Sequence, residues 1–475
     1  MGPHAKAGGL ADVIAALPVA LKRAGAEVSV ILPGYKALLD QFHTQPLSEN
    51  LSVALGAERE PFRILRADGP AGVPLFLIDH PGFFGRVGIY GEHGAEYPDN
   101  LRRFIFFGRA AAMAAAINPP DVLHAHDWHA APAPIVIRAE ASIRERFAAT
   151  VSAFTIHNVA FQGIFERGDY PLLGLESSWF SIDCLEFYGK VNLMKGAVQL
   201  ADGVSTVSPA YAYEVAHDAE MGVGLEGVFR AKGERFVGIL NGADYDEWNP
   251  AGDELIPARY TPADRGGKRT CLHDLREQLG LQHRPDVPLV GMISRMTAQK
   301  GFDLIEQGLE RILALGVQLV ILGDGDARIE KYFREAQQRH PGNFGVTMGF
   351  DNRLAHRIQA GSDMFLMPSR FEPCGLTQMY ALKYGTVPVV RATGGLKDTV
   401  TQFEAVSVRG NGFVFVDYRT EAMIDALQSA VRTFRAPALW QRLMDNCFMA
   451  DFSWARAARE YLGWFERMRR ERVTA

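Results

Sequence analysis

The feature that most constrains the fold of this chain is an alternation of apolar strand-like runs with amphipathic helices, which occurs twice. The first series extends from residue 10 to residue 240 and the second from residue 287 to residue 401. Between them, residues 251–288 are polar, rich in proline and carry one short helical pattern, so we expect a domain junction there. Strands that alternate with helices form parallel sheets. We therefore predict an α/β protein with two Rossmann-like parallel-sheet domains facing a central cleft.

The length of 475 residues agrees with two domains, because one hydrophobic core rarely organises so long a chain. We place the first domain at residues 1–245 and the second at residues 246–453. The helix predicted at the C-terminal end, within residues 454–475, is expected to pack back toward the first domain. The predicted strands lie at residues 28–32, 74–78, 151–157, 204–208, 236–240, 287–293, 317–322, 344–348, 363–367 and 387–390.

The charge and cysteine content exclude several classes of protein. A net charge of −5, without runs of Lys or Arg, argues against a nucleic-acid-binding surface. There is no apolar run near 18 residues and no signal-peptide pattern at the N-terminus, so we expect no membrane association. The four cysteines are scattered, which is typical of a reducing compartment. We expect a cytoplasmic protein, and the sequence does not indicate its oligomeric state.

The turn at residues 368–378, P-S-R-F-E-P-C-G-L-T-Q, joins a buried strand to a helix. It carries Glu372, Cys374 and the flexible Gly375 at the carboxyl edge of the predicted sheet. Ligands bind at that edge in open α/β sheets, and helix N-termini favour anions. Taken alone, the turn is equally well explained as a plain connection.

Two cations, Arg295 and Lys300, lie five residues apart in the loop after the first strand of the second series. Arg binds a diphosphate as a planar fork and Lys binds it as a point charge. The alternative is a pair of solvated surface cations. Their position at the carboxyl end of a strand favours binding.

The first series has polar strand ends of its own. The motif D-V-L-H-A-H-D-W-H at residues 121–129 could suggest a metal site, but its Asp falls one place early for the hydrolase pattern that it resembles. We expect Asp127 to face a cleft, and His124 and His126 to be core residues. His157 and Asn158 end the next strand.

The motif K-A-G-G-L-A-D places Lys6 and two glycines at the start of a helix at residues 10–24. Backbone N–H groups there could meet a phosphate, although from spacing alone a glycine turn with a solvated Lys6 is slightly favoured. A glycine loop of this type normally follows a strand, and no strand pattern precedes this one.

Together these motifs resemble the bacterial glycogen synthase and plant starch synthase family. The match includes T-I-H-N-V-A-F-Q-G, G-M-I-S-R-M-T-A-Q-K-G, P-S-R-F-E-P-C-G-L-T-Q and T-G-G-L-K-D-T-V, in order along the chain. The resemblance implies a GT-B fold and a retaining transfer of glucose from ADP-glucose to the non-reducing end of an α-1,4-glucan. It also implies that no metal or other cofactor takes part.

The resemblance implies roles for individual residues in the second domain. Arg295 and Lys300 would stabilise the departing diphosphate. Glu372 would hold the transferred glucose, with Cys374 beside it. Backbone N–H groups at Gly375, Leu376 and Thr377 would assist on the donor side, and the adenine would lie near residues 350–356.

In the first domain, the resemblance implies that Asp127, His157 and Asn158 line the sugar side, with Asn241 at the junction. Asp127 and His157 are counted with the catalytic residues. The donor-binding residues that the resemblance implies in the first domain are Lys6, Gly9, Asp12, Tyr90, Asn158 and Asn241.

The sequence departs from the family pattern in four places, one of which is Ala7, where the family usually has Thr or Val. The first strand is absent, as a late start codon or a trimmed sequence would explain. Ala243 stands where the family has Ile, and Phe350 where it often has Tyr. Two alternatives remain: a related GT-B transferase with another donor or acceptor, and a glucan- or nucleotide-binding protein without catalysis.

Overall fold

A computed structural model describes residues 9–92 and 95–474 of the chain, which forms two compact units. Unit 1 comprises Met1–Gly242 together with Trp454–Ala475, and unit 2 comprises Ala243–Ser453. Each unit is built on parallel strands covered by helices, as the alternation in the sequence predicts. The C-terminal helix belongs to unit 1, although it follows unit 2 in the sequence.

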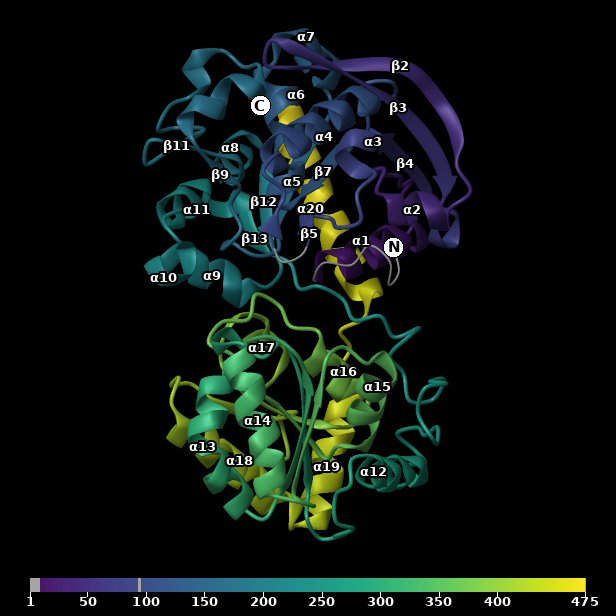
Figure 1. Cartoon of the computed structure of the whole chain (residues 1–475), viewed down its shortest axis with the longest axis vertical. Helices are drawn as coiled ribbons and strands as arrows, with labels where there is room; N and C mark the ends of the chain where they lie inside the picture. Colours follow the sequence, from purple (N-terminus) through teal and green to yellow (C-terminus); the bar gives the residue numbers. More distant parts are fainter. Residues whose placement is uncertain (1–8, 93–94, 475) are drawn as a thin grey trace. The chain divides into compact units, whose positions relative to one another are not determined.

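Unit 2 contains one continuous, fully parallel sheet with the strand order β16-β15-β14-β17-β18-β19. Helices cover both faces of this sheet, which Figure 1 shows nearly edge-on. Its strands are β14 (Leu289–Ile293), β15 (Gln318–Gly323), β16 (Phe344–Met348), β17 (Met364–Met367), β18 (Val387–Arg391) and β19 (Phe413–Phe415). Its main helices are α12 (Gly266–Gln278), α13 (Phe302–Ala314), α14 (Ala327–Arg339), α15 (Asn352–Gly361), α16 (Thr377–Lys383), α17 (Gly394–Thr399), α18 (Thr420–Phe434) and α19 (Pro437–Met449).

The strand order of unit 2 has its reversal point at the centre. The chain proceeds outward from β14 through β15 to β16, then returns to the other side of β14 and continues through β17, β18 and β19. In open α/β sheets, ligands bind at the carboxyl ends of the strands where the order reverses. The loops that follow β14 and β17 meet at this point, and they are the two loops in which the sequence placed Arg295, Lys300 and Glu372.

Unit 1 contains two four-stranded sheets, whereas unit 2 contains one six-stranded sheet. The first is parallel, in the order β13-β12-β8-β7, and the second has the order β1-β4-β3-β2. Within the second sheet only β1 and β4 are parallel. The strands are β1 (Val30–Pro33), β2 (Gln45–Leu55), β3 (Glu58–Asp68), β4 (Pro74–Asp79), β7 (Val122–His126), β8 (Val151–Ile156), β12 (Gly203–Thr206) and β13 (Phe236–Gly238).

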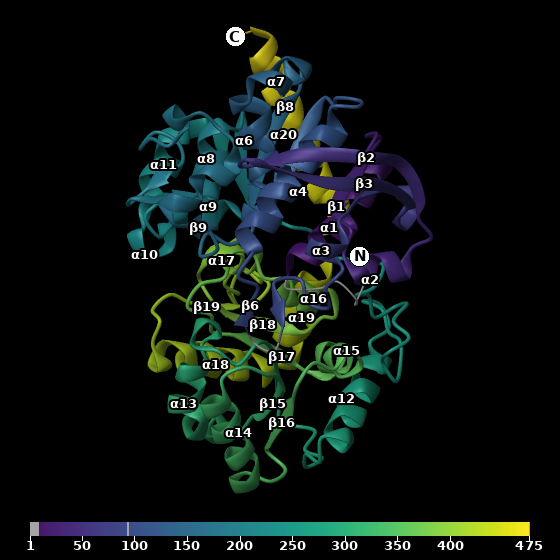
Figure 2. The ribbon, with the colours of Figure 1, turned by 45° about the horizontal axis from the view of Figure 1, so that its top comes forward.

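The antiparallel hairpin β2–β3 was not predicted. In its second strand, Phe62 and Ile64 are buried in one core cluster and Leu65 and Ala67 in another, so the apolar pattern changes phase within the strand. Its first strand is mostly exposed and pairs with irregular register. The hairpin lies alongside α4 (Asn100–Ala115), as Figure 2 shows. A second, short hairpin is formed by β5 (Gly91–Glu92) and β6 (Ala95–Glu96).

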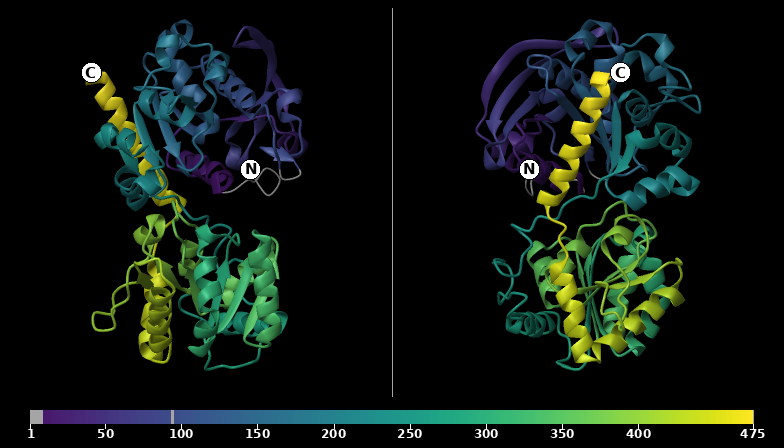
Figure 3. Two further views of the ribbon diagram at one scale, coloured as in Figure 1. Left: turned by 60° about the vertical axis from the view of Figure 1, so that its left-hand side comes forward. Right: turned by 180° about the vertical axis from the view of Figure 1, so that it is seen from behind.

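Helices cover both faces of the sheets in unit 1. On one face, α1 (Gly9–Arg23) packs against α20 (Trp454–Thr474), which extends along the unit in Figure 3. Their apolar residues share a core with Val151 and Ala153 of β8. On the other face, α4 packs against α6 (Pro132–Ala139) and the second sheet. The other helices of unit 1 with eight or more residues are α8 (Leu193–Leu200) and α9 (Pro209–His217).

Candidate functional site

The loops after β14 and β17 are held against each other by their backbones. The N–H of Arg370 donates to the carbonyl of Gln299 over 2.8 Å. Gly301 has φ of +78°, and a Cβ at this position would lie 2.1 Å from the carbonyl oxygen of Pro368. A residue with a side chain would therefore be both strained and in collision, so the close contact of the two loops requires glycine here.

This contact brings Lys300 and Glu372 into an ion pair. Lys300 Nζ lies 2.6 Å from Glu372 Oε2, and the two side chains are only 18% and 7% exposed. The hydroxyl of Ser369 donates to the same carboxylate oxygen over 3.1 Å. A charge-assisted bond in so little solvent fixes both groups. The sequence predicted each residue for a ligand and did not predict that they pair with each other.

Arg295 lies in the same loop but is placed differently. Its side chain is exposed and forms no ion pair with any of the described residues. Its guanidinium therefore presents its donors to solvent at the carboxyl end of β14. Lys300 is thus held by its ion pair with Glu372, whereas the guanidinium of Arg295 is accessible to a ligand.

The turn from Glu372 to Gln378 is fixed from behind by α17. Cβ atoms at Gly394 and Gly395 would lie 2.0 Å from the carbonyl oxygens of Glu372 and Cys374, so both glycines are needed for this approach. The buried amide of Gln378 donates to the carbonyls of Cys374 and Gly375. From the sequence alone, this turn could have been a plain connection. In the structure, close backbone contacts and side-chain hydrogen bonds fix its conformation.

The first residues of α16 end this turn. Gly375 adopts φ of +70°, and α16 begins at Thr377 without a side chain that caps its N-terminus. The Thr377 hydroxyl donates to the sulfur of Met367 over 3.4 Å, and Cys374 is buried. The positions predicted for the donor side, Cys374 to Thr377, thus follow Glu372 directly at the reversal point of the sheet.

Residues 350–356, predicted near an adenine, divide into two kinds. Phe350 is 79% exposed, so its ring is available for stacking. His356 is buried, bonds to Asp253 over 2.8 Å and stacks on Trp248 at 3.8 Å. Burial lowers the pKa of His356, but its bonds to Asp253 and Glu247 outweigh this effect and raise it. His356 is therefore a structural residue.

In unit 1, the ends of β7 and β8 bring Asp127 and His157 together. Asp127 Oδ1 accepts the backbone N–H of His157 over 2.7 Å. Asp127 adopts φ of +56°, an uncommon conformation for a residue with a side chain. Residues in such conformations often occur at functional sites, where the surrounding structure holds them.

The acidity of Asp127 is unusual. Burial raises its pKa to about 7, and the backbone N–H groups of His157 and Asn158 only partly oppose this effect. The carboxyl can therefore exchange a proton near neutral pH.

Three histidines of β7 and the end of β8, His124, His126 and His157, form a linked, uncharged group. His126 Nδ1 lies 3.0 Å from His157 Nε2, and His124 Nε2 lies 2.6 Å from the Thr155 hydroxyl. Burial lowers the pKa of His157 to about 3 and that of His126 well below its usual value. His124 packs against aromatic rings of α20, as expected for a core histidine. His126 was predicted to be a core residue as well, but it contacts the candidate site residue His157.

Tyr90 and the unpredicted His129 complete this cluster. Their rings stack with centroids 4.9 Å apart, and burial raises the pKa of Tyr90. His129 Nδ1 is buried and has no hydrogen-bond partner in the described part of the chain. A third histidine in the D-V-L-H-A-H-D-W-H motif was the only signal for His129.

The other described site residues predicted in unit 1 lie at the start of α1 and after β13. Gly9 is exposed at the N-terminus of α1, and Asp12 lies in the first turn of that helix. Asn241 is buried, and its side-chain oxygen has no partner among the residues described. Lys6 lies outside the described residues.

Residues 9–92 and 95–474 contain no group of three His, Cys, Asp or Glu side chains placed to hold a metal ion. None of their helices combines the length and hydropathy needed to cross a membrane.

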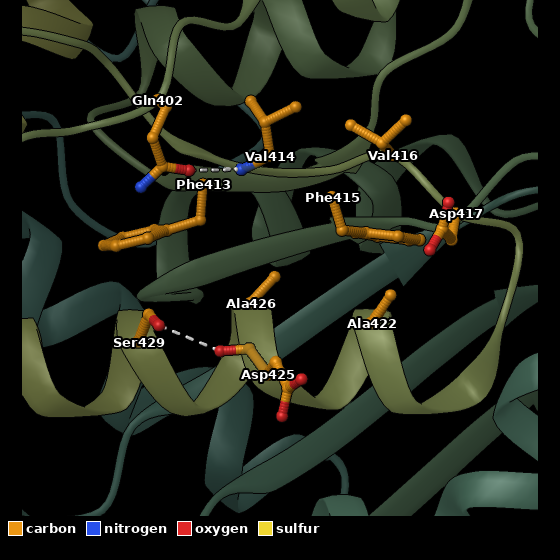
Figure 4. A pocket seen from close by; sticks show the side chains of 10 residues that line it. All are labelled: Gln402, Phe413, Val414, Phe415, Val416, Asp417, Ala422, Asp425, Ala426 and Ser429. Carbon is orange, nitrogen blue, oxygen red and sulfur yellow. Dashed lines mark hydrogen bonds between the residues drawn. The ribbon is translucent and has the colours of Figure 1, made fainter.

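A hollow of about 360 Å³ between β19 and α18 contains none of the predicted site residues (Figure 4). The Gln402 side chain in its wall already accepts the N–H of Val414 over 2.9 Å. This hollow is separate from the loops at the reversal point.

The whole chain is similar to known sequences. Residues 1–231 match the family described as starch synthase catalytic domain, and residues 275–434 match glycosyl transferases group 1. The glycogen synthase of Koribacter versatilis (strain Ellin345) is 42% identical over 99% of this chain and 97% of its own length. That of Anaeromyxobacter sp. (strain Fw109-5) is 44% identical over 97% and 96%.

The structure is also similar to a solved one. The catalytic domain of starch synthase IV from Arabidopsis thaliana, bound to ADP and acarbose, superimposes with a TM-score of 0.89 at 34% identity. The match covers 99% of this chain and 98% of that one. The similarity therefore extends over both units.

Proposed function

Because the chain belongs to the starch and glycogen synthase family of glycosyltransferases, we propose that it transfers glucose from ADP-glucose to an α-1,4-glucan. The glucose is added to the non-reducing end of the glucan, and its anomeric configuration is retained. The observation that carries this proposal is the convergence of Lys300, Glu372 and Arg295 on the two loops at the reversal point of unit 2.

Breaking the bond between a sugar and a phosphate places negative charge on the departing diphosphate, so fixed cations lower the barrier. Lys300 has three N–H donors, of which Glu372 accepts one, so two remain for phosphate oxygens. Arg295 adds a planar fork of donors from the same loop. These two cations supply the positive charge in the proposed reaction, which uses no metal ion or other cofactor.

Glu372 has two roles in this proposal. It holds the Lys300 ammonium in place, and its carboxylate accepts hydrogen bonds from hydroxyls of the transferred glucose. It is not assigned as a covalent nucleophile. The acceptor approaches on the face of the leaving group, and the departing phosphate takes the acceptor's proton.

In unit 1, the proposal assigns sugar binding to Asp127, His157 and Asn158. The neutral imidazole of His157 can both donate and accept a hydrogen bond. Asp127 keeps a second carboxyl oxygen beside the one that accepts the N–H of His157. Tyr90, Asp12, Asn241 and the Lys6–Gly9 segment are assigned to the donor.

The test is ADP release from ADP-glucose with and without glycogen, together with the anomeric configuration of the product by NMR. Release that depends on glucan, with an α-linked product, is expected. Turnover with UDP-glucose alone would overturn the assignment of the donor. Glucan binding without turnover of either nucleotide sugar would favour a non-catalytic binding protein.

A further inference from the structure

Arg103, in the first turn of α4, is a charged residue with no exposed surface. It forms no ion pair among the described residues, and the nearby Asp99 is bound instead by Arg86 over 2.7 and 2.6 Å. Its guanidinium lies over three aromatic rings, those of Phe84, Tyr97 and Phe104, at 5.5, 4.9 and 5.3 Å from their centroids. Burying an unpaired charge is costly, and the ring faces recover only part of that cost.

The guanidinium binds three acceptors at and before the start of α4, which an apolar side chain could not do. Its Nε donates to the carbonyl of Phe83 over 2.8 Å, and its Nη1 donates to the carbonyl of Ile89 over 3.1 Å. Nη1 also donates to Asn100 Oδ1 over 2.6 Å, and Asn100 Nδ2 donates in turn to the carbonyl of Tyr90 over 2.9 Å. Arg103 and Asn100 together therefore bind the carbonyls of two consecutive residues.

Tyr90 connects this network to the polar cluster of unit 1. Its ring stacks on that of His129 with centroids 4.9 Å apart, and it lies 6.0 Å from the ring of Phe104. Backbone carbonyls that are bound on one side of a segment fix the direction in which its side chains leave on the other. The contact from Arg103 to the Tyr90 ring thus passes through Asn100 and the Tyr90 backbone.

We propose that Arg103 is a positioning residue that holds Tyr90 for contact with the donor. The proposal rests on the proposed function, in which Tyr90 is assigned to the donor. Without the guanidinium, the carbonyl of Ile89 loses a donor and the amide of Asn100 loses the partner that orients it. The Tyr90 ring would then sample several positions, and small displacements of a binding group weaken binding strongly.

The alternative is that Arg103 only stabilises the packing of α4, and Arg109 provides the matched control. Arg109 lies on the same helix and is 8% exposed. It donates to the carbonyl of Leu173 over 2.5 Å and pairs with Glu140 over 2.6 Å, so its bonds do not reach Tyr90 or His129. Loss of either arginine removes buried bonds from α4, but only loss of Arg103 releases Tyr90.

The first test compares Arg103→Met with Arg109→Met by steady-state kinetics of ADP release and by thermal melts. We expect Arg103→Met to raise KM for ADP-glucose about tenfold or more while kcat changes by less than about threefold. Arg109→Met should lower Tm and leave KM within about twofold of the parent value. Equal changes of KM in the two variants, or a lowered Tm without a change of KM in Arg103→Met, would overturn the proposal.

A double-mutant cycle with Tyr90→Ala tests whether Arg103 acts through Tyr90. If it does, the double variant should have the KM of Tyr90→Ala alone, whereas independent effects would multiply and would overturn the proposal. If Arg103→Met does not fold, Asn100→Ala breaks the same connection with the guanidinium still in place, and the cycle is carried out with that variant under the same criteria.

A measurement without turnover separates this proposal from the proposed function. The N–H of Tyr97 donates to the carbonyl of Tyr90 over 2.9 Å, so its hydrogen exchange reports on the held segment. We expect faster exchange at Tyr97 in Arg103→Met and no change in Arg109→Met. Unchanged exchange in Arg103→Met would overturn the positioning role, whereas a parent chain that releases no ADP would overturn the proposed function.

Discussion

The two units build their centres differently. In unit 2, β14 and β17 pair directly through Val290 with Met364 and Gly291 with Phe365, and five residues of β14 pair with β15. In unit 1, β1 and β7 belong to different sheets, and both line a cavity of about 1360 Å³. Four of the five residues of β14 are buried, whereas three of the four residues of β1 are only partly buried.

This difference has a consequence for the candidate sites. The loops of unit 2 that carry Lys300 and Glu372 follow two strands that are hydrogen-bonded to each other, so each supports the other. In unit 1, Asp127 and His157 are positioned by β7 and β8, while Tyr90, His126 and His129 of the same cluster line the cavity. We therefore expect the site residues of unit 2 to be the more rigidly held.

The largest effect is expected at the anchored cation of unit 2. Lys300→Ala removes positive charge from the position of the leaving diphosphate, and kcat for ADP release should fall by about 10²- to 10³-fold. Lys331→Ala is the matched control, because Lys331 is 78% exposed on α14 and distant in sequence from both loops. A decrease of less than tenfold for Lys300→Ala would contradict its assigned role.

The second prediction compares the two sheets directly. Leu289→Ala in the buried β14 should lower the free energy of unfolding by about 2–5 kcal/mol. Leu32→Ala in β1 should cost about 1 kcal/mol, because its side chain is only partly buried and lines the cavity. Urea unfolding measures both. Equal costs would show that β1 is as well packed as β14.

The third prediction concerns the contact between the loops. Gly301→Ala adds a Cβ in collision with the backbone of Pro368 and should destabilise unit 2 by about 3 kcal/mol, with a loss of activity. Gly280→Ala is the control, since Gly280 also has positive φ, of +65°, but no atom within 4 Å of the added Cβ. The control should cost only the conformational strain, about 1 kcal/mol. Equal losses in thermal melts would exclude the collision as the cause.

The smallest effect is a pH dependence in unit 1. The pKa of Asp127 is about 7 in the folded protein and roughly 3.9 in an unfolded chain. The folded state keeps a proton that the unfolded state loses, so this contribution to stability is present below pH 4 and disappears as the pH rises through 7.

Asp127→Asn removes that titration while keeping an oxygen that can accept the N–H of His157. From pH 5 to pH 8, the free energy of unfolding of the parent chain, relative to the variant, should decrease by about 2.6 kcal/mol. Urea titrations at several pH values measure this difference. Parallel pH profiles of the two proteins would show that Asp127 has an ordinary pKa.

Much of the fold could be predicted from local pattern. The helix expected at residues 10–24 corresponds to α1, and the strands expected around Val290 and Phe365 correspond to β14 and β17. These elements have strong apolar periodicity. The hairpin β2–β3 and the short β19 were missed, because an exposed strand with irregular pairing and a three-residue strand leave little periodic signal.

The candidate site was predictable only in part. Polar residues at strand ends identified Asp127, His157, Lys300 and Glu372 as candidates. Their partners were not predictable, since the Lys300–Glu372 pair joins residues 72 positions apart and depends on strand order. The bond between His126 and His157 depends likewise on the pairing of β7 with β8.

The sequence by itself determined the strands and helices with strong apolar periodicity and which charged side chains follow those strands, because both depend on neighbours along the chain. The tertiary structure decided that β14 and β17 pair, and hence that Lys300 meets Glu372. It also decided that β1 and β7 belong to different sheets and line a common cavity. Strand order depends on contacts between distant residues, so it becomes visible only when the layers are assembled.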